Sequence, residues 1–330
     1  MKALLNRLFD YGQLTREEAR ELLVCMSAGE LNPSQMAAFL SVFVMRDITA
    51  EELNGFREAL LELRVPIDFD GRATVDLCGT GGDGKNTFNV STLAAFITAG
   101  AGYAVTKHGN YGVSSVCGSS NVLEHLGYTF TAEADVLHRQ LDAAGICFLH
   151  APKFHPAMKT VAPVRRELGI KTFFNMLGPL VNPCQPQHQV IGVFNLKVLR
   201  LYQFLHEGLD KNVALVHSLD GYDEISLTGG FKLIRKGDED LFSPELLGLP
   251  RLTQESLYGG ETVGEAADLF VHILKGHGTE AQKTVTSINA GAAIQTFHPE
   301  RSLHDCYLEA RTALDDGRAL NAFTQLLNTA

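Results

Sequence analysis

A stretch without carboxylates stands out in this sequence, because the chain as a whole is acidic. Between Asp83 and Glu124 there is no aspartate or glutamate, and the stretch opens with the glycine-rich run from Gly79 to Gly84. Most of its polar residues are hydrogen-bond donors or cations: Lys85, Thr87, Asn89, Ser91, Thr92, Lys107, His108, Asn110, Ser114, Ser115 and Ser119. Phosphate oxygens require such donors without competing negative charge. The pattern therefore predicts a site for a strongly anionic ligand.

The glycine run matches the dinucleotide-binding pattern only in part. Gly79, Gly81 and Gly84 fit G-x-G-x-x-G after a predicted strand. A dinucleotide site also needs an acidic residue about 20 residues further on, where it binds the ribose hydroxyls. The next predicted strand ends instead in Lys107 and His108. We therefore reject a nicotinamide-type cofactor.

The P-loop pattern fails as well, because the spacing before Lys85 is wrong and Asn86 follows the lysine. What remains is a strand, a glycine turn, and a helix that begins near Ser91 and Thr92 and ends around Gly100. The N-terminal amides of such a helix, aided by its dipole, can cradle a diphosphate. The plainer alternative is that Ser91 or Thr92 only caps the helix.

Two adjacent acids follow another predicted strand. Residues 213–217 form a short β-branched run, and the loop after it carries Asp223 and Glu224. Ligands of parallel sheets bind beyond the carboxyl ends of the strands. Magnesium takes one or two carboxylates together with waters and phosphate oxygens, so this pair is a candidate metal site. An Asp-Glu pair is more often a solvated turn, and that alternative stays open on these residues alone.

The first 66 residues carry helical patterns with clear start signals. Three capping boxes precede apolar stripes of helical period: Thr15 with Glu18, Asn32 with Gln35, and Thr49 with Glu52. The apolar faces of these helices need partners. They can bury one another, or they can form part of a homodimer interface.

From Thr74 onward the pattern changes to short β-branched runs that alternate with helices. The predicted strands lie at residues 74–78, 104–107, 146–149, 190–194 and 213–217. This alternation predicts an α/β fold class, with a mostly parallel central sheet and surrounding helices. We expect a small helical domain at residues 1–68, joined by helices from about 160–182, and a larger α/β domain at 73–330 that binds the anionic ligand.

Composition limits the classes of partner. The net charge of −10 disfavours nucleic acid and anionic membranes, so an anion site must be a local concentration of donors. The six cysteines show no Cys-x-x-Cys pair or regular spacing, which indicates reduced thiols and a cytoplasmic location. The chain shows neither an apolar signal-peptide core nor a run long enough to span a bilayer.

These motifs together resemble those of the anthranilate phosphoribosyltransferase family of tryptophan biosynthesis. The resemblance rests on the runs 79–84, 87–92 and 107–110, on Ser114 and Ser115, and on Arg165. It continues through residues 175–180, Asp223 with Glu224, and residues 289–293, and so covers nearly the whole chain. It implies a two-domain homodimer that uses magnesium (Mg²⁺). Such an enzyme transfers phosphoribosyl from phosphoribosyl pyrophosphate to the amine of anthranilate.

The resemblance also implies which residues form the site. Those for phosphoribosyl pyrophosphate are Gly79, Gly82, Asp83, Thr87, Asn89, Val90, Ser91, Thr92, Lys107, Ser115 and Ser119. Those for anthranilate are Gly79, His108, Asn110, Arg165, Gly178 and Pro179. Those for magnesium are Ser91, Asp223 and Glu224.

The chemistry of this reaction needs little from an acid or a base. An aryl amine is neutral at physiological pH and can attack the anomeric carbon without first losing a proton. We therefore assign no general acid or base and expect Lys107, Asn110 and Arg165 to act by positioning and charge. The planar fork of Arg165 suits the anthranilate carboxylate. His108 could accept the proton after attack, but we rank a role as a pocket wall higher.

The chain departs from the family pattern at three positions of one loop. Tyr111 replaces the usual arginine, Cys117 the usual serine, and Asn121 the usual aspartate. Two other functions are alternatives for such a chain. A pyrimidine nucleoside phosphorylase shares this architecture, but the candidate metal pair Asp223 and Glu224 disfavours this function. A non-catalytic relative that binds nucleic acid would need a basic surface, which the net charge disfavours.

Overall fold

The computed structural model describes residues 1–112 and 117–329. Four helices form the N-terminal part: α1 (Lys2–Phe9), α2 (Arg16–Ser27), α3 (Pro33–Met45) and α4 (Ala50–Glu62). All three predicted capping boxes are present, with reciprocal hydrogen bonds at the starts of α2, α3 and α4. These caps satisfy backbone amides that the first helical turn leaves without partners, which is why the local pattern predicted the helix starts.

A seven-stranded sheet forms the centre of the rest, in the order β3-β2-β1-β4-β5-β6-β7. Five strands are parallel: β1 (Val75–Gly79), β2 (Val105–Gly109), β3 (Ile146–His150), β4 (His188–Gly192) and β5 (Asn212–Ser218). The predicted α/β class with a mostly parallel sheet is confirmed, and each predicted strand overlaps one of these five.

Two antiparallel strands extend the sheet beyond β5. They are β6 (Phe231–Arg235) and β7 (Asp238–Phe242), which form a hairpin. The sequence analysis did not predict this hairpin. The reason is that β7 has the sequence DEDLF, whose charged residues carry no β-branched signal.

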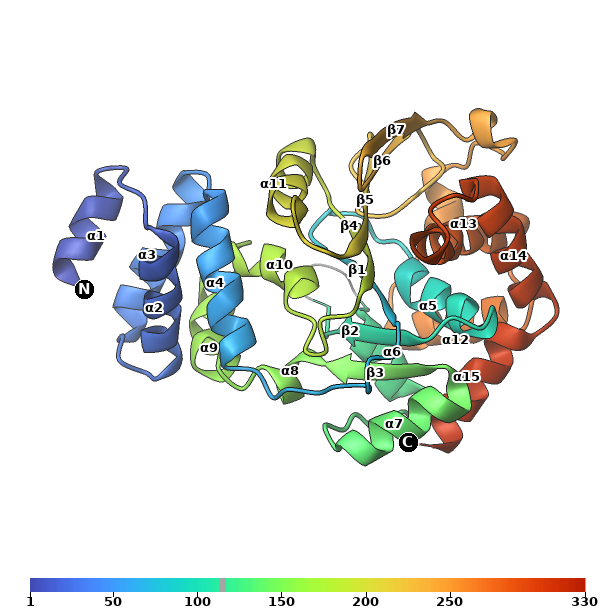
Figure 1. Ribbon diagram of the computed structural model, residues 1–330, viewed down its shortest axis with the longest axis horizontal. Helices are drawn as coiled ribbons and strands as arrows, with labels where there is room; N and C mark the ends of the chain where they lie inside the picture. The colour runs from blue at the N-terminus through green and yellow to red at the C-terminus, as the bar shows by residue number, and fades with distance from the viewer. Residues whose placement is uncertain (113–116, 330) are drawn as a thin grey trace.

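Helices cover both faces of the sheet. The remaining helices are α5 (Val90–Gly100), α6 (Ser119–His125), α7 (Ala134–Ala144), α8 (Ala151–Phe154), α9 (Met158–Leu168), α10 (Phe174–Leu177), α11 (Leu196–His206), α12 (Val263–Leu274), α13 (Glu280–Phe297), α14 (Leu303–Asp315) and α15 (Arg318–Asn328). Figure 1 shows α1–α4 with α9 at one end of the molecule, and α5 with α12–α15 beyond the sheet. The buried helix α13 packs against α5, β4 and β5.

Two large apolar clusters lie on opposite sides of the sheet. One joins α5 and α12–α15 to β1, β2, β3 and β5. The other joins α1–α4 to α9, α10, α11 and the facing side chains of β4 and β5. The central strands therefore lie between two layers of helices. One layer contains α1–α4 with α9–α11, and the other contains α5 with α12–α15. The domain division at residues 1–68 and 73–330 stays a prediction.

None of the helices within residues 1–112 and 117–329 combines the length and the apolar character that a membrane span requires.

Candidate active site

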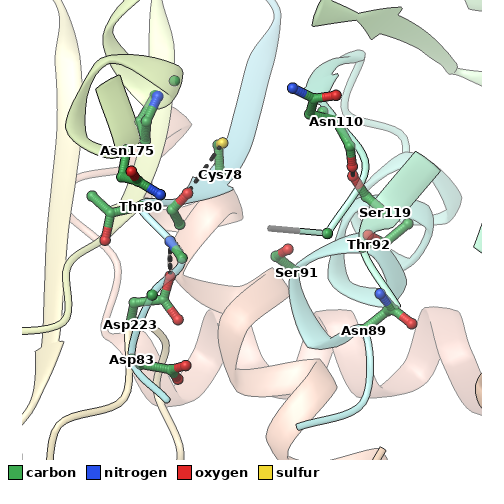
Figure 2. Close-up of a pocket in the computed structure, with 18 of the residues that line it drawn as sticks. Cys78, Thr80, Asp83, Asn89, Ser91, Thr92, Asn110, Ser119, Asn175 and Asp223 are labelled. Carbon is green, nitrogen blue, oxygen red and sulfur yellow. Dashed lines mark hydrogen bonds between the residues drawn. The ribbon is translucent and has the colours of Figure 1, made fainter. Parts of the chain in front are cut away.

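A cavity of about 300 Å³ lies at the carboxyl ends of β1 and β2. Its walls come from the glycine turn after β1, the start of α5, the end of β2, the segment 174–179, and the loop after β5. Figure 2 shows Thr80, Asp83 and Asp223 on one side of this cavity and Ser91, Thr92 and Ser119 on the other. The polar side chains of distant segments thus face one another across a single space.

The glycine turn after β1 has a backbone conformation that residues other than glycine would not readily adopt. Gly81, Gly82 and Gly84 have φ values of 65°, 79° and 73°, in the left-handed region that glycine tolerates best. The turn is held at two points. The amide of Thr80 donates to the Gly192 carbonyl at 2.9 Å, and the amide of Gly81 donates to Asp223 Oδ2 at 2.7 Å.

Helix α5 presents its first turn to the cavity, as the sequence predicts. Asn89 occupies the cap position without a side-chain cap bond, and its amide group donates instead to the Cys117 carbonyl at 3.0 Å. The cap position therefore leaves the first amides of the helix open to a ligand. Ser91 and Thr92 line the cavity directly behind it. An anion is the ligand that such a helix start favours.

Lys107 is the buried cation of the site. It is the middle residue of β2, with only 2% of its surface exposed, and its ammonium group donates to the Leu77 carbonyl. Asp76 lies beside it, fully buried, and accepts bonds from the His108 amide at 3.0 Å and from Asn182 Nδ2 at 2.9 Å. Burial raises the pKa of Asp76 to about 6, although the Lys107 charge and these hydrogen bonds oppose the rise.

His108 is neutral in this environment. Burial, followed by the neighbouring His155, lowers its pKa to about 3. Its Nδ1 lies 3.1 Å from the Gly178 carbonyl, which can only accept, so Nδ1 carries the proton. Nε2 then holds a lone pair, and it is buried without a hydrogen-bond partner in the described part of the chain. His108 can accept a hydrogen bond in the pocket but is a weak base.

Three carboxylates gather below the glycine turn. Burial, and then mutual repulsion, raise the pKa of Asp223 and Glu224, and burial raises the pKa of Asp83. Glu224 Oε1 and Asp83 Oδ2 are buried and have no hydrogen-bond partner among the residues described. Ser91 lines a small cavity together with Asp223 and Glu224. Oxygen atoms in need of positive charge are what a hard divalent cation requires.

These residues fit magnesium as a shared site rather than as a closed cage. Across residues 1–112 and 117–329, no group of three or more His, Cys, Asp or Glu side chains is arranged to hold a metal alone. Magnesium usually keeps several waters and takes substrate phosphate oxygens, so two carboxylates and one hydroxyl are sufficient protein ligands.

The opposite end of the cavity offers a cation over an aromatic ring. Arg165, on α9, is partly buried, and its guanidinium carbon lies 5.0 Å from the centre of the Phe174 ring. Burial lowers the pKa of Arg165, and it has no carboxylate partner in the described residues. A planar carboxylate would supply the missing negative charge. His108, Asn110, Gly178 and Pro179 line the same cavity.

Comparison with known proteins agrees with this geometry. Residues 2–63 match the model of the glycosyl transferase family, helical bundle domain, and residues 71–320 match that of the glycosyl transferase family, a/b domain. The anthranilate phosphoribosyltransferase of Flavobacterium psychrophilum is 54% identical over 99% of this chain and 98% of its own. The enzyme of Flavobacterium johnsoniae is 52% identical over the same shares. The chain belongs to the anthranilate phosphoribosyltransferase family.

Solved structures give the same result for the fold. The anthranilate phosphoribosyltransferase of Thermus thermophilus aligns with a TM-score of 0.90 and 35% identity, over 98% of each chain. The Saccharomyces cerevisiae enzyme, in complex with PRPP and Mg, aligns with a TM-score of 0.90 over 98% of this chain and 96% of that one. At 22% identity the yeast structure supports the fold alone. As a family member, the chain is a glycosyltransferase of the pentosyl-transferring class.

Within the family pattern, the structure brings the predicted site residues together. Every one of them that the structure describes lines the cavity of about 300 Å³, from Gly79 to Glu224. Ser115 lies outside the described residues. The individual roles of these side chains stay predictions.

The three departures from the family pattern also have places in the structure. Asn121 Oδ1 accepts bonds from the amides of Gly112 at 2.9 Å and Gly118 at 3.0 Å, so it joins residues on either side of 113–116. The Tyr111 hydroxyl donates to Glu124 at 3.1 Å. Cys117 is buried, and burial raises the pKa of its thiol, which does not suit a nucleophile.

Sequence reasoning missed four residues that support the site. They are Asp76 and Asn182 beside Lys107, Gly192 behind Asp223, and Lys171 beside Gly82. Asp76 precedes the glycine run, so its place in a strand beside the turn was a usable signal. The other three lie far away in the sequence and carried no local signal.

Proposed function

We propose that this chain transfers the 5-phosphoribosyl group of phosphoribosyl pyrophosphate to the amine of anthranilate. The products are N-(5-phosphoribosyl)anthranilate and pyrophosphate, in the second step of tryptophan biosynthesis from chorismate. One observation carries the proposal. Hydrogen-bond donors from residues 85–119 face the acids Asp223 and Glu224 across a single cavity, and the arginine of this cavity, Arg165, has no carboxylate partner among the described residues.

The donor substrate is held by the glycine turn, the start of α5, and Lys107. We assign its phosphates to Gly82, Asp83, Thr87, Asn89, Val90, Ser91, Thr92, Ser115 and Ser119. Buried Lys107 then provides fixed positive charge where the leaving diphosphate gains negative charge, and such preorganised charge lowers the barrier most. Gly79 lies at the junction of the two substrates, where a side chain would meet Asp223.

Asp223, Glu224 and the Ser91 hydroxyl would hold magnesium. The structure of the yeast relative is in complex with PRPP and Mg, which supports the use of magnesium. When bound, the ion neutralises diphosphate charge. The raised pKa values of both carboxylates indicate that their charged forms are destabilised without a cation. Because both lie outside the glycine turn, their repulsion of the donor is limited.

The acceptor is held at the other end of the cavity. Arg165 binds the anthranilate carboxylate, Asn110 contacts the acceptor, and Gly178 with Pro179 closes one side. His108 acts as a wall and hydrogen-bond acceptor through Nε2, because its pKa of about 3 makes it a poor proton carrier at neutral pH. The neutral amine attacks without prior deprotonation, so alignment and charge supply most of the rate.

Two further assignments complete the proposal. The N-terminal helices form a homodimer interface, which is supported by apolar side chains left exposed there: Phe9 at 55%, Tyr11 at 72%, Val44 at 50% and Met45 at 79%. The enzyme works in the cytoplasm, as the pattern of its cysteines indicates.

The test is an assay of purified protein with phosphoribosyl pyrophosphate and anthranilate, with and without magnesium. We expect product only with magnesium, and a loss of at least about 100-fold when Asp223→Asn is combined with Glu224→Gln. The matched control is Asp238→Asn with Glu239→Gln, an adjacent acid pair on β7 remote from the cavity. Equal rates for the two double variants would remove the metal assignment, and no product from the wild type would remove the function.

A further inference from the structure

Lys171 follows helix α9 in the sequence and contacts the glycine turn after β1. It lies in the short segment between α9 and α10, just after Gly169 ends α9 in a left-handed conformation. Helix α9 packs against α2 and α3. From this side the Lys171 ammonium group reaches across and donates a hydrogen bond to the carbonyl of Gly82. The two residues are 89 positions apart in the sequence.

A second set of contacts fixes the path of this side chain. The Lys171 ammonium lies 5.7 Å from the centre of the Phe194 ring, just beyond β4, within the range of a cation–π contact. Its aliphatic part runs along the turn, because a Cβ atom added at Gly82 would lie 3.4 Å from Lys171 Cε. Lys171 is therefore packed on the Gly82 backbone although the residue is exposed to solvent.

The bond has a geometric consequence for the next amide. In a trans peptide the carbonyl and the following N–H belong to one plane and point in opposite directions. Holding the Gly82 carbonyl toward the α9 side therefore makes the N–H of Asp83 point in the opposite direction, away from that side. In the described part of the chain this N–H has no hydrogen-bond partner. Both Gly82 and Asp83 line the cavity.

Glycine makes such an external hold necessary. Gly82 has φ of 79° between two other glycines with positive φ, at Gly81 and Gly84. Glycine populates several backbone regions at similar energy, so Gly82 itself offers little resistance to rotation of this peptide plane. A carbonyl turned toward the donor would repel its phosphates, whereas an N–H would bind them.

We propose that Lys171 is a positioning residue for the donor substrate, and this inference rests on the proposed function. By holding the Gly82 carbonyl, Lys171 presents the Asp83 amide to a phosphate of phosphoribosyl pyrophosphate. It acts through the backbone and does not itself contact the donor. Arg165 stands on α9, six positions before Lys171, so α9 and the segment that follows it support both substrate sites.

The test is calorimetric binding of phosphoribosyl pyrophosphate with magnesium but without anthranilate. We expect Lys171→Met to weaken donor binding about tenfold, the loss of one charge-assisted hydrogen bond. Lys171→Arg, which keeps charge and donors, should recover most of the affinity. Lys197→Met removes a surface lysine paired with Asp47 outside the cavity and should bind the donor as the wild type does.

Steady-state kinetics separates positioning from a merely structural role. The KM for the donor should rise in Lys171→Met, while the KM for anthranilate and the melting temperature stay at wild-type values. Wild-type donor affinity in Lys171→Met overturns the inference and leaves the proposed function intact. Equal rises in both KM values with a lower melting temperature also overturn it. A wild type that binds the donor tightly but makes no product would refute the proposed function alone.

Discussion

The substitution Gly192→Ala should displace Asp223 and so lower the activity of the enzyme. Gly192 ends β4, next to Gly79 in the sheet, and contacts the loop after β5. A Cβ atom there would lie 1.5 Å from the Asp223 carbonyl oxygen, whereas real Cβ contacts are essentially never under 3.0 Å. The φ of Gly192 is not in the left-handed region, so the backbone itself accepts alanine. The whole effect of Gly192→Ala therefore falls on Asp223.

The loop that carries Asp223 cannot move away freely. Ser218 Oγ donates to the Glu224 carbonyl at 2.6 Å, and the Asn289 side chain bonds both backbone groups of Ile225 at 3.0 and 2.9 Å. The methyl group must therefore displace Asp223 by more than 1 Å or distort these bonds. A misplacement of about 1 Å in a catalytic arrangement can lower the rate about 100-fold, equivalent to about 2.7 kcal/mol. We expect kcat/KM to fall by at least that factor.

The assay is product formation from both substrates over a series of magnesium concentrations. Gly229→Ala is the matched control, because its Cβ would make an ordinary contact of 3.5 Å with Asp220 in the same loop. Circular dichroism confirms that both variants are folded. A folded Gly192→Ala enzyme with wild-type kcat/KM and wild-type magnesium dependence would refute the claim that the place of Asp223 below the glycine turn matters.

Two other predictions concern the acceptor and the response to acid. Arg165→Met should raise the KM for anthranilate at least about tenfold through loss of a charge-assisted pair, with Arg165→Lys in between and the donor KM unchanged; a change confined to the donor KM would contradict the assignment. Burial, with Arg57 and Lys211 nearby, lowers the pKa of His206 from 6.5 to about 4. The neutral form of His206 is favoured in the folded state, so its contribution to the free energy of unfolding is complete above pH 6.5 and is lost as the pH falls toward 4. Between these pH values, the free energy of unfolding should drop about 3 kcal/mol less in His206→Gln than in the wild type, measured by urea denaturation; parallel curves for the two proteins would contradict it.

Local patterns in the sequence were sufficient where the physics is local. The capping boxes of α2, α3 and α4 depend on residues three positions apart, so the sequence predicted those helix starts correctly. The run from Gly79 to Gly84 must form a turn in any fold, and a parallel sheet gathers the carboxyl ends of its strands at one edge. For these reasons the donor wall and the pair Asp223 and Glu224 were predictable before any coordinates were known.

Only the tertiary structure decided which distant groups touch. Asp76 meets Asn182 across 106 residues, Gly192 shapes the place of Asp223, and Lys171 reaches Gly82. The charged strand β7 joins the sheet because β6 offers it a free edge, not because of its own composition. Such contacts depend on strand register and on the packing of helices against the sheet, which accumulate over the whole chain. No short window of sequence contains that information, whereas caps, turns and alternating patterns lie entirely within one.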